Sequence, residues 1–86
     1  MNEKKNVSLE ILSEIYNIKT DIPEPQLLAM RDLVNAKMRS VQEKAPNLNY
    51  KTIAVLVALE LAKEKMDLEK EYTSLNTLLK EENLIF

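Results

Sequence analysis

The stretch that decides the fold spans residues 50–82 and reads YKTIAVLVALELAKEKMDLEKEYTSLNTLLKEE. It contains neither proline nor glycine, the two residues that most disfavour a helix interior, so it predicts one continuous helix. Such a helix is about 50 Å long at 1.5 Å per residue, whereas a compact domain of this chain length has a radius of gyration of about 12 Å. The helix must therefore extend beyond the domain that its own chain can build.

The two halves of this helix differ in character. Residues 53–62 are apolar on almost every side, with an interruption at Glu60, which is typical of a buried segment. Apolar residues also recur with a heptad period, with Ala54, Leu61, Leu68 and Leu75 at one core position and Ala58, Tyr72 and Leu79 at the other, where Lys65 intervenes once.

A leucine seam of this kind favours a partner helix, because each leucine contributes about 1.5–3 kcal/mol when it is buried. The alternative is an intramolecular core. We expect an oligomer interface made of Ile53, Leu56, Val57, Leu61, Leu68, Tyr72, Leu75 and Leu79. The pattern leaves open whether the oligomer is a dimer or a tetramer, and whether the helices pair parallel or antiparallel.

Upstream of Pro46 the chain predicts a shorter helix over residues 22–45. Asp21 is the expected N-cap, Pro46 ends the helix, and Asn49 is the expected N-cap of the long helix. Apolar residues at spacings of three and four predict its buried face, namely Leu27, Met30, Val34, Met38, Val41 and Ala45.

Residues 6–20 alternate between polar and apolar and predict a β-hairpin. A tight turn at Ser13-Glu14 would pair Ile11 with Tyr16 and Leu9 with Ile18. The alternative is a helix over residues 7–19, but the abundance of Ile, Val and Tyr favours strands. The expected turn has no glycine, although two-residue hairpin turns favour Gly or Asn-Gly.

These elements predict an α+β, mostly helical fold. The hairpin and the shorter helix would form a small head over residues 1–48, and residues 49–86 would form a long C-terminal helix. The first half of that helix would be buried in the head and the dimer core, and its second half would be a coiled coil.

Composition disfavours enzyme chemistry. The 86 residues include no histidine, cysteine or glycine, so the usual general base, the zinc thiolates and the glycine-rich phosphate loop cannot be built. We expect no catalytic residue, no metal site, no cofactor and no small-molecule substrate. A net charge of −2 argues against nucleic-acid binding. The N-terminus lacks a signal region and residues 53–59 are too few to cross a bilayer, so we expect a cytoplasmic protein without membrane insertion.

Three segments, in this order and spacing, resemble the ZapA family of cell division proteins in its short, Gram-positive form. They are residues 34–39 (VNAKMR), 43–48 (EKAPNL) and 53–59 (IAVLVAL), preceded by a similar hairpin pattern. The resemblance implies a homodimer or homotetramer that binds FtsZ protofilaments at the division site, bundles them and promotes Z-ring assembly during septation. One departure is clear: the family usually has glycine in the hairpin turn, where this chain has Ser13.

Basic residues gather around the end of the shorter helix and the start of the long one. They are Lys37, Arg39, Lys44 and Lys51, the candidate contacts with FtsZ, whose surface is acidic in general. The alternative is a solvated helix face with an Arg39–Glu43 pair. Basic hairpin-turn residues implicated in the family have no counterpart, because Glu14 and Asn17 stand there. Alternative functions are a generic coiled-coil scaffold or a small dimeric nucleic-acid-binding regulator.

Overall fold

The computed structural model describes residues 3–82, except for the side chains of residue 76 and residues 78–82. Two strands are followed by two helices: β1 (Lys5–Ile11), β2 (Glu14–Thr20), α1 (Glu24–Lys44) and α2 (Tyr50–Glu82). The predicted α+β, mostly helical fold is confirmed, and the helical alternative for residues 7–19 is wrong. The side chain of Leu79 and the apolar tail at residues 84–86 lie outside the described residues.

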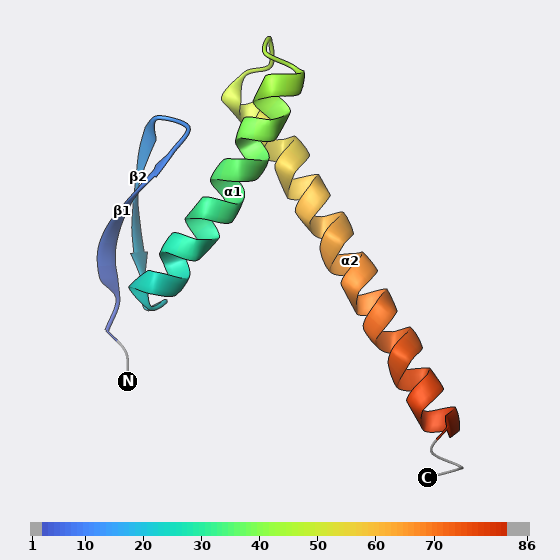
Figure 1. Ribbon diagram of the computed structural model, residues 1–86. Helices are drawn as coiled ribbons and strands as arrows, with labels where there is room; N and C mark the ends of the chain where they lie inside the picture. Colours follow the sequence, from blue (N-terminus) through green and yellow to red (C-terminus); the bar gives the residue numbers. More distant parts are fainter. Residues whose placement is uncertain (1–2, 83–86) are drawn as a thin grey trace.

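The molecule is a flat V. The two helices meet at the short connection over residues 45–49 and then diverge, and the hairpin runs alongside α1 (Figure 1). The radius of gyration is 18.2 Å and the principal extents are 55 × 41 × 15 Å. A compact chain of this length would have a radius of gyration of about 12 Å. The long helix therefore extends beyond the rest of its own chain, as its length predicts.

The hairpin turn consists of Leu12 and Ser13, one residue earlier than predicted. Ile11 pairs with Glu14 and Leu9 pairs with Tyr16, so the predicted pairing of Ile11 with Tyr16 is wrong. Both turn residues have positive φ, 48° and 69° respectively, as a two-residue type I′ turn requires. The error of two residues in register leaves each side chain on its predicted face, because side chains alternate with a period of two.

The core lies where the hairpin turn, α1 and the first turns of α2 meet. Its buried members are Leu12, Met38, Ile53 and Val57, and partly buried side chains pack around them, namely Ile11, Val34, Val41, Leu48 and Leu61. Leu9 on β1 and Leu27 on α1 are also buried, where α1 packs on β1. The core is small because much of α2 extends away from it.

The helix ends show which capping predictions hold. Asn49 Oδ1 accepts a hydrogen bond from the backbone N–H of Thr52 at 2.8 Å, so Asn49 is the N-cap of α2 as predicted. The prediction for Asp21 is wrong: the N-cap of α1 is Pro23, with no side-chain capping bond, and the helix starts two residues later than expected. Proline is compatible with this end, because the first backbone N–H groups of a helix have no partner inside it.

Candidate functional site

The apolar face of α2 is largely uncovered in the single chain. The exposed fraction is 65% for Leu68, 69% for Tyr72 and 56% for Leu75, and Leu56 also remains 41% exposed. These four residues belong to the predicted oligomer interface. Val55, Leu59 and Met66 are also exposed, but their spacing along the helix places them on the opposite side of α2 from Leu68. A soluble monomer rarely leaves a contiguous apolar surface of this kind without an occupant.

The remaining predicted interface residues belong to the intramolecular core. Ile53 is fully buried and Val57 is 3% exposed, both packed with Leu12 and Met38 of their own chain. Leu61 is partly buried beside them. Ile53 and Val57 thus have almost no surface left to bury against a second chain. The part of the seam that is open to a partner begins beyond them, and the side chain of Leu79 is not described.

An apolar groove lies on the head, between the hairpin and the start of α2. Its cavity volume is about 540 Å³, and it is lined mainly by Ile11, Tyr16, Ile18, Met38, Tyr50 and Ala54. The groove exists because α1 packs on β1 and leaves the inner face of β2 incompletely covered. Tyr16 is consequently 45% exposed although it pairs with the buried Leu9. The groove places a second uncovered apolar surface next to α2.

A second groove, polar in character, adjoins the hairpin turn, because Leu12 and Ser13 line part of it, and its cavity volume is about 510 Å³. Arg31, Asn35 and Arg39 follow one another at four-residue spacing on α1 and line it together with Glu10 and Tyr50. Arg31 Nε donates to Asp32 Oδ1 at 2.7 Å. Of these residues the sequence predicted only Arg39 as a candidate contact. Arg31 and Asn35 could have been found with it, because a spacing of four residues places all three on one face of α1. Nothing in the local pattern pointed to Tyr50.

Asn35 and Tyr50 hold the hairpin turn from two different helices. The backbone N–H of Leu12 donates to Asn35 Oδ1 at 3.0 Å, and the Tyr50 hydroxyl donates to the Leu12 carbonyl at 3.0 Å. Both backbone groups of Leu12 are therefore satisfied by side chains, which offsets the positive φ at this non-glycine residue. The contacts fix the head by joining the hairpin turn to α1 and α2 at one residue.

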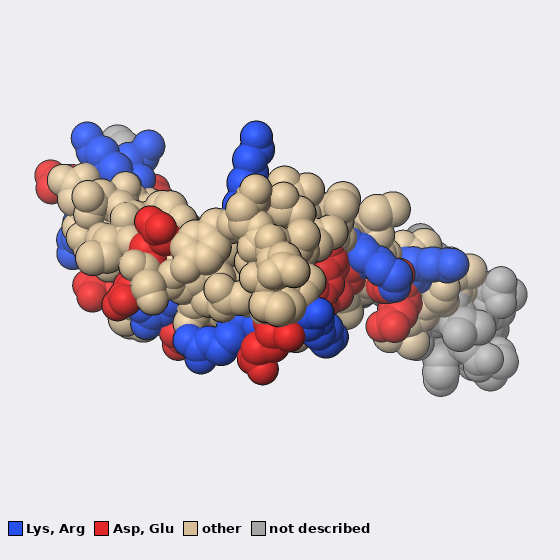
Figure 2. All heavy atoms as spheres, turned by 90° about the horizontal axis from the view of Figure 1, so that it is seen from above, with Lys and Arg blue, Asp and Glu red and all other residues tan. Residues whose placement is uncertain are grey.

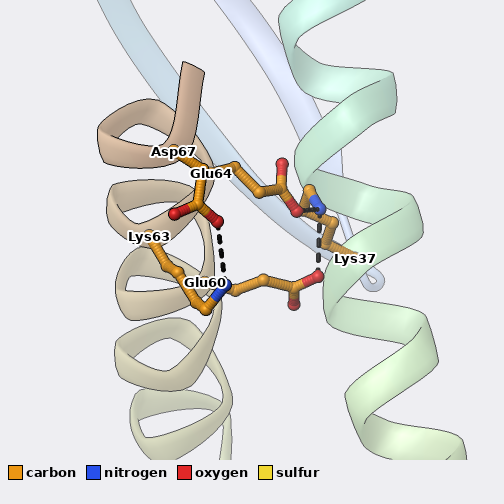
Figure 3. A network of polar contacts seen from close by, with 5 residues as sticks. All are labelled: Lys37, Glu60, Lys63, Glu64 and Asp67. Atoms are coloured by element: carbon orange, nitrogen blue, oxygen red, sulfur yellow. Dashed lines mark hydrogen bonds and ion pairs between the residues drawn. The ribbon is translucent and has the colours of Figure 1, made fainter. Parts of the chain in front are cut away.

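The four predicted basic residues do not form one patch. Lys37 bridges to α2, where its Nζ donates to Glu60 Oε1 at 3.1 Å and to Glu64 Oε2 at 2.5 Å (Figure 3). These hydrogen bonds, first the one to Glu64, raise the pKa of Lys37 above its ordinary value. The other three candidates, Arg39, Lys44 and Lys51, are exposed. The expected Arg39–Glu43 pair is not among the ion pairs of the described side chains.

Charged side chains are distributed unevenly over the surface. Seen from above, uncharged residues cover much of the middle of the molecule, and Lys, Arg, Asp and Glu groups lie mostly around it and along the distal part of α2 (Figure 2). Among the side chains that the structure describes, no group of three or more acidic, histidine or cysteine residues is placed to hold a metal ion. No helix within residues 3–82 combines the length and the apolar character needed to cross a membrane.

The fold and these surfaces define a class of protein: a small hairpin head carried on a long amphipathic helix with an uncovered apolar face. The chain belongs to the cell division protein ZapA family, whose model matches residues 7–84. This confirms the resemblance seen in the sequence and supports a role in cell division.

Two relatives and one solved structure show how far the similarity extends. The cell division protein ZapA of Bacillus pumilus (strain SAFR-032) is 30% identical over 78 residues, which cover 91% of this chain and 92% of that protein. The ZapA of Geobacillus kaustophilus (strain HTA426) is 33% identical over 79 residues, covering 92% and 87%. A ZapA mutant dimer from Geobacillus stearothermophilus superposes with a TM-score of 0.70 at 31% identity, covering 93% of each chain.

Proposed function

We propose that this chain is a non-catalytic homo-oligomer that binds FtsZ protofilaments at the division site in the cytoplasm, bundles them and promotes Z-ring assembly. Membership of the ZapA family supports this role. The observation that carries the proposal is the uncovered apolar face of α2, on which Leu68, Tyr72 and Leu75 are each more than half exposed. Burying such side chains stabilises an assembly by about 1.5–3 kcal/mol each, which favours pairing with a second copy.

Bridging follows from the separation of a head from a long helix. In this proposal residues 1–48 form the head that contacts FtsZ, and residues 49–86 join the copies. A single head holds one filament. Two heads connected through paired helices hold two filaments, because the first contact raises the effective concentration of the second head near its filament.

Exposed basic residues at the end of α1 and the start of α2 are the proposed contacts with FtsZ. Arg39, Lys44 and Lys51 are all accessible to a partner, and Arg39 also lines the polar groove beside the hairpin turn. Cationic side chains of this kind accelerate association with an acidic partner and make it sensitive to salt. Lys37 stands apart, because its ammonium group is already bound to two carboxylates.

Self-association is tested by the molar mass of the purified chain and of two variants, measured by light scattering at several concentrations. Leu68→Glu places a charge in the seam and should lower the mass, since an unpaired charge is costly to bury. Ser74→Glu is the matched control: it introduces the same charge two residues from Tyr72, away from both heptad core positions, and should assemble as the parent does. A monomeric parent, or a Leu68→Glu variant of unchanged mass, would refute pairing through this seam.

Binding to FtsZ is tested by sedimentation of FtsZ polymers with and without the protein, together with light scattering of the mixture. The parent should co-pellet and raise the scatter. A triple variant with Arg39, Lys44 and Lys51 each changed to Gln should lose co-pelleting while it keeps its oligomeric mass. Changing Lys63, Lys70 and Lys80 to Gln alters the charge equally but further along α2 and outside both heptad core positions, and should leave binding intact. Equal loss in both triple variants would mean that total charge, rather than these three residues, determines binding.

A further inference from the structure

We propose that Lys37 is a strut that bridges the two helices through Glu60 and Glu64 and thereby sets the angle of the V. Its consequence is a fixed orientation of the head relative to the distal part of α2. The inference goes beyond the proposed function, because it concerns the geometry of the single chain and holds whichever partner the head binds.

The arrangement of the three side chains carries the inference. Lys37 points from α1 across the opening of the V, and its Nζ lies between the carboxylates of Glu60 and Glu64 (Figure 3). These carboxylates belong to residues 23 and 27 positions further along the chain. Glu60 and Glu64 are four residues apart, so they lie on the same face of α2. The Lys37 side chain is only 16% exposed, whereas the two glutamates are about half exposed.

Glu64 of the strut lies about one turn beyond Leu61, the furthest residue of α2 that packs against the core. Val34 and Met38 of α1 and Val57 and Leu61 of α2 belong to the same packed cluster near the apex. Beyond Glu64, no hydrogen bond or ion pair joins the described side chains of α2 to α1. A contact at the open end of a packed region resists a change of angle better than one at the apex, because it acts on a longer arm.

The other ion pairs of the described side chains connect residues within one helix. Lys63 pairs with Asp67 at 2.8 Å and Lys65 pairs with Glu69 at 4.0 Å, both along α2. The Lys37 cluster joins two helices, and a compact ammonium group with three donors is suited to two carboxylates that approach from different positions. Lys63 therefore offers a matched control: it is a lysine of the same molecule, engaged with a carboxylate, that cannot affect the angle of the V.

The experiment measures the angle as a distance between two spin labels by pulsed electron paramagnetic resonance. The chain has no cysteine, so Gln26→Cys on α1 and Lys70→Cys on α2 attach the labels at those sites alone. Labelled chain is mixed with an excess of unlabelled chain, which removes distances between copies. Residue 70 is about 30 Å along the helix from Tyr50, so a change of about 10° in the angle moves it by about 5 Å.

Lys37→Met keeps the apolar stem and removes the charge, and we expect the mean distance to shift by about 5 Å or the distribution to broaden to a comparable extent. The double variant Glu60→Gln with Glu64→Gln removes both carboxylates and should give the same change. These two side chains are about half exposed, so the double variant keeps the test valid if Lys37→Met does not fold. Lys37→Arg, which retains the charge, and Lys63→Met should preserve the parent distribution.

The strut is refuted if the double glutamine variant keeps the parent distribution, or if Lys63→Met changes the distribution as much as Lys37→Met does. None of these readouts involves FtsZ. A failure of the strut is thereby distinguishable from a failure of the proposed function, which the sedimentation experiment tests by itself.

Discussion

Replacing Ser13 by glycine should stabilise the protein. Ser13 is exposed and has a φ of 69°, a value that costs a residue with a Cβ atom about 1–2 kcal/mol. Glycine adopts this conformation without that cost but loses about 0.5–1 kcal/mol more conformational entropy on folding. The difference is a net gain of about 0.5–1 kcal/mol in the free energy of unfolding.

Replacing the neighbouring turn residue, Leu12, by glycine should instead lower the free energy of unfolding. Leu12 has a φ of 48°, but its side chain is 8% exposed and belongs to the core. Leu12→Gly relieves the same backbone cost and removes a buried leucine, a loss of about 2–5 kcal/mol in comparable large-to-small substitutions. The net effect is a destabilisation of at least about 1 kcal/mol, so two glycine substitutions in one turn should act in opposite directions.

Urea unfolding followed by circular dichroism at one fixed protein concentration measures both effects. With a slope of about 1–2 kcal/mol/M, Ser13→Gly should raise the midpoint by about 0.5 M. Ser13→Ala is the control, because alanine keeps the cost of positive φ and should unfold close to the parent. A Ser13→Gly midpoint at or below that of Ser13→Ala would refute the reasoning, since glycine would then gain nothing from the conformation of the turn.

Three further predictions concern single side chains. Tyr50→Phe removes the hydroxyl that donates to the Leu12 carbonyl and should lower stability by about 1–2 kcal/mol in the same urea assay; no change would show that water replaces the hydroxyl. Asn49→Ala should cost about 1 kcal/mol because the N–H of Thr52 loses its cap, whereas Asn49→Asp should stay near the parent. The ammonium group of Lys37 should titrate above 10.5 in a carbon-13 NMR experiment on its ε-carbon, since hydrogen bonds to two carboxylates raise its pKa. Its contacts should therefore persist at neutral pH and be lost as the pH rises through the elevated pKa; titration at or below 10.5 would contradict this.

The long helix was predictable because its signals are local. Residues 50–82 lack proline and glycine, and Asn49 precedes them as a cap, so both the extent and the start of α2 follow from the sequence. The start of α1 was predicted less accurately, since the N-cap is Pro23 and not Asp21 as expected. A proline at a helix end needs no side-chain cap, and propensity alone does not choose between the two positions.

The hairpin was predictable as a pattern of faces but not in its register. A period of two gives the same faces for pairings that differ by two residues, so the turn had to decide between them. The expectation of a turn at Ser13-Glu14 treated Leu12 as a strand residue. The turn instead uses Leu12, because contacts from Asn35 and Tyr50 and burial in the core support it there. Those contacts come from residues far away in the sequence, so the pattern of residues within the hairpin does not predict them.

In the candidate site, too, the features that depend on local spacing were predictable and the contacts between distant segments were not. Exposure of Leu68, Tyr72 and Leu75 agrees with the heptad pattern, which depends only on spacing along one helix. The partners of Lys37 could not be foreseen, because they depend on how closely α1 and α2 approach across the V. A sequence pattern places a residue on the face of its own helix but does not give the angle between two helices.

The contact between Tyr50 and Leu12 also has a consequence for the order of events during synthesis. The two residues are 38 positions apart, an interval that a ribosome adding 5–20 residues per second covers in about 2–8 s. An isolated two-stranded hairpin is at best marginally stable in water. The hairpin is thus the first element to be synthesised, but it becomes stably folded only after the beginning of α2 has been translated. Until then we expect it to fluctuate in the nascent chain.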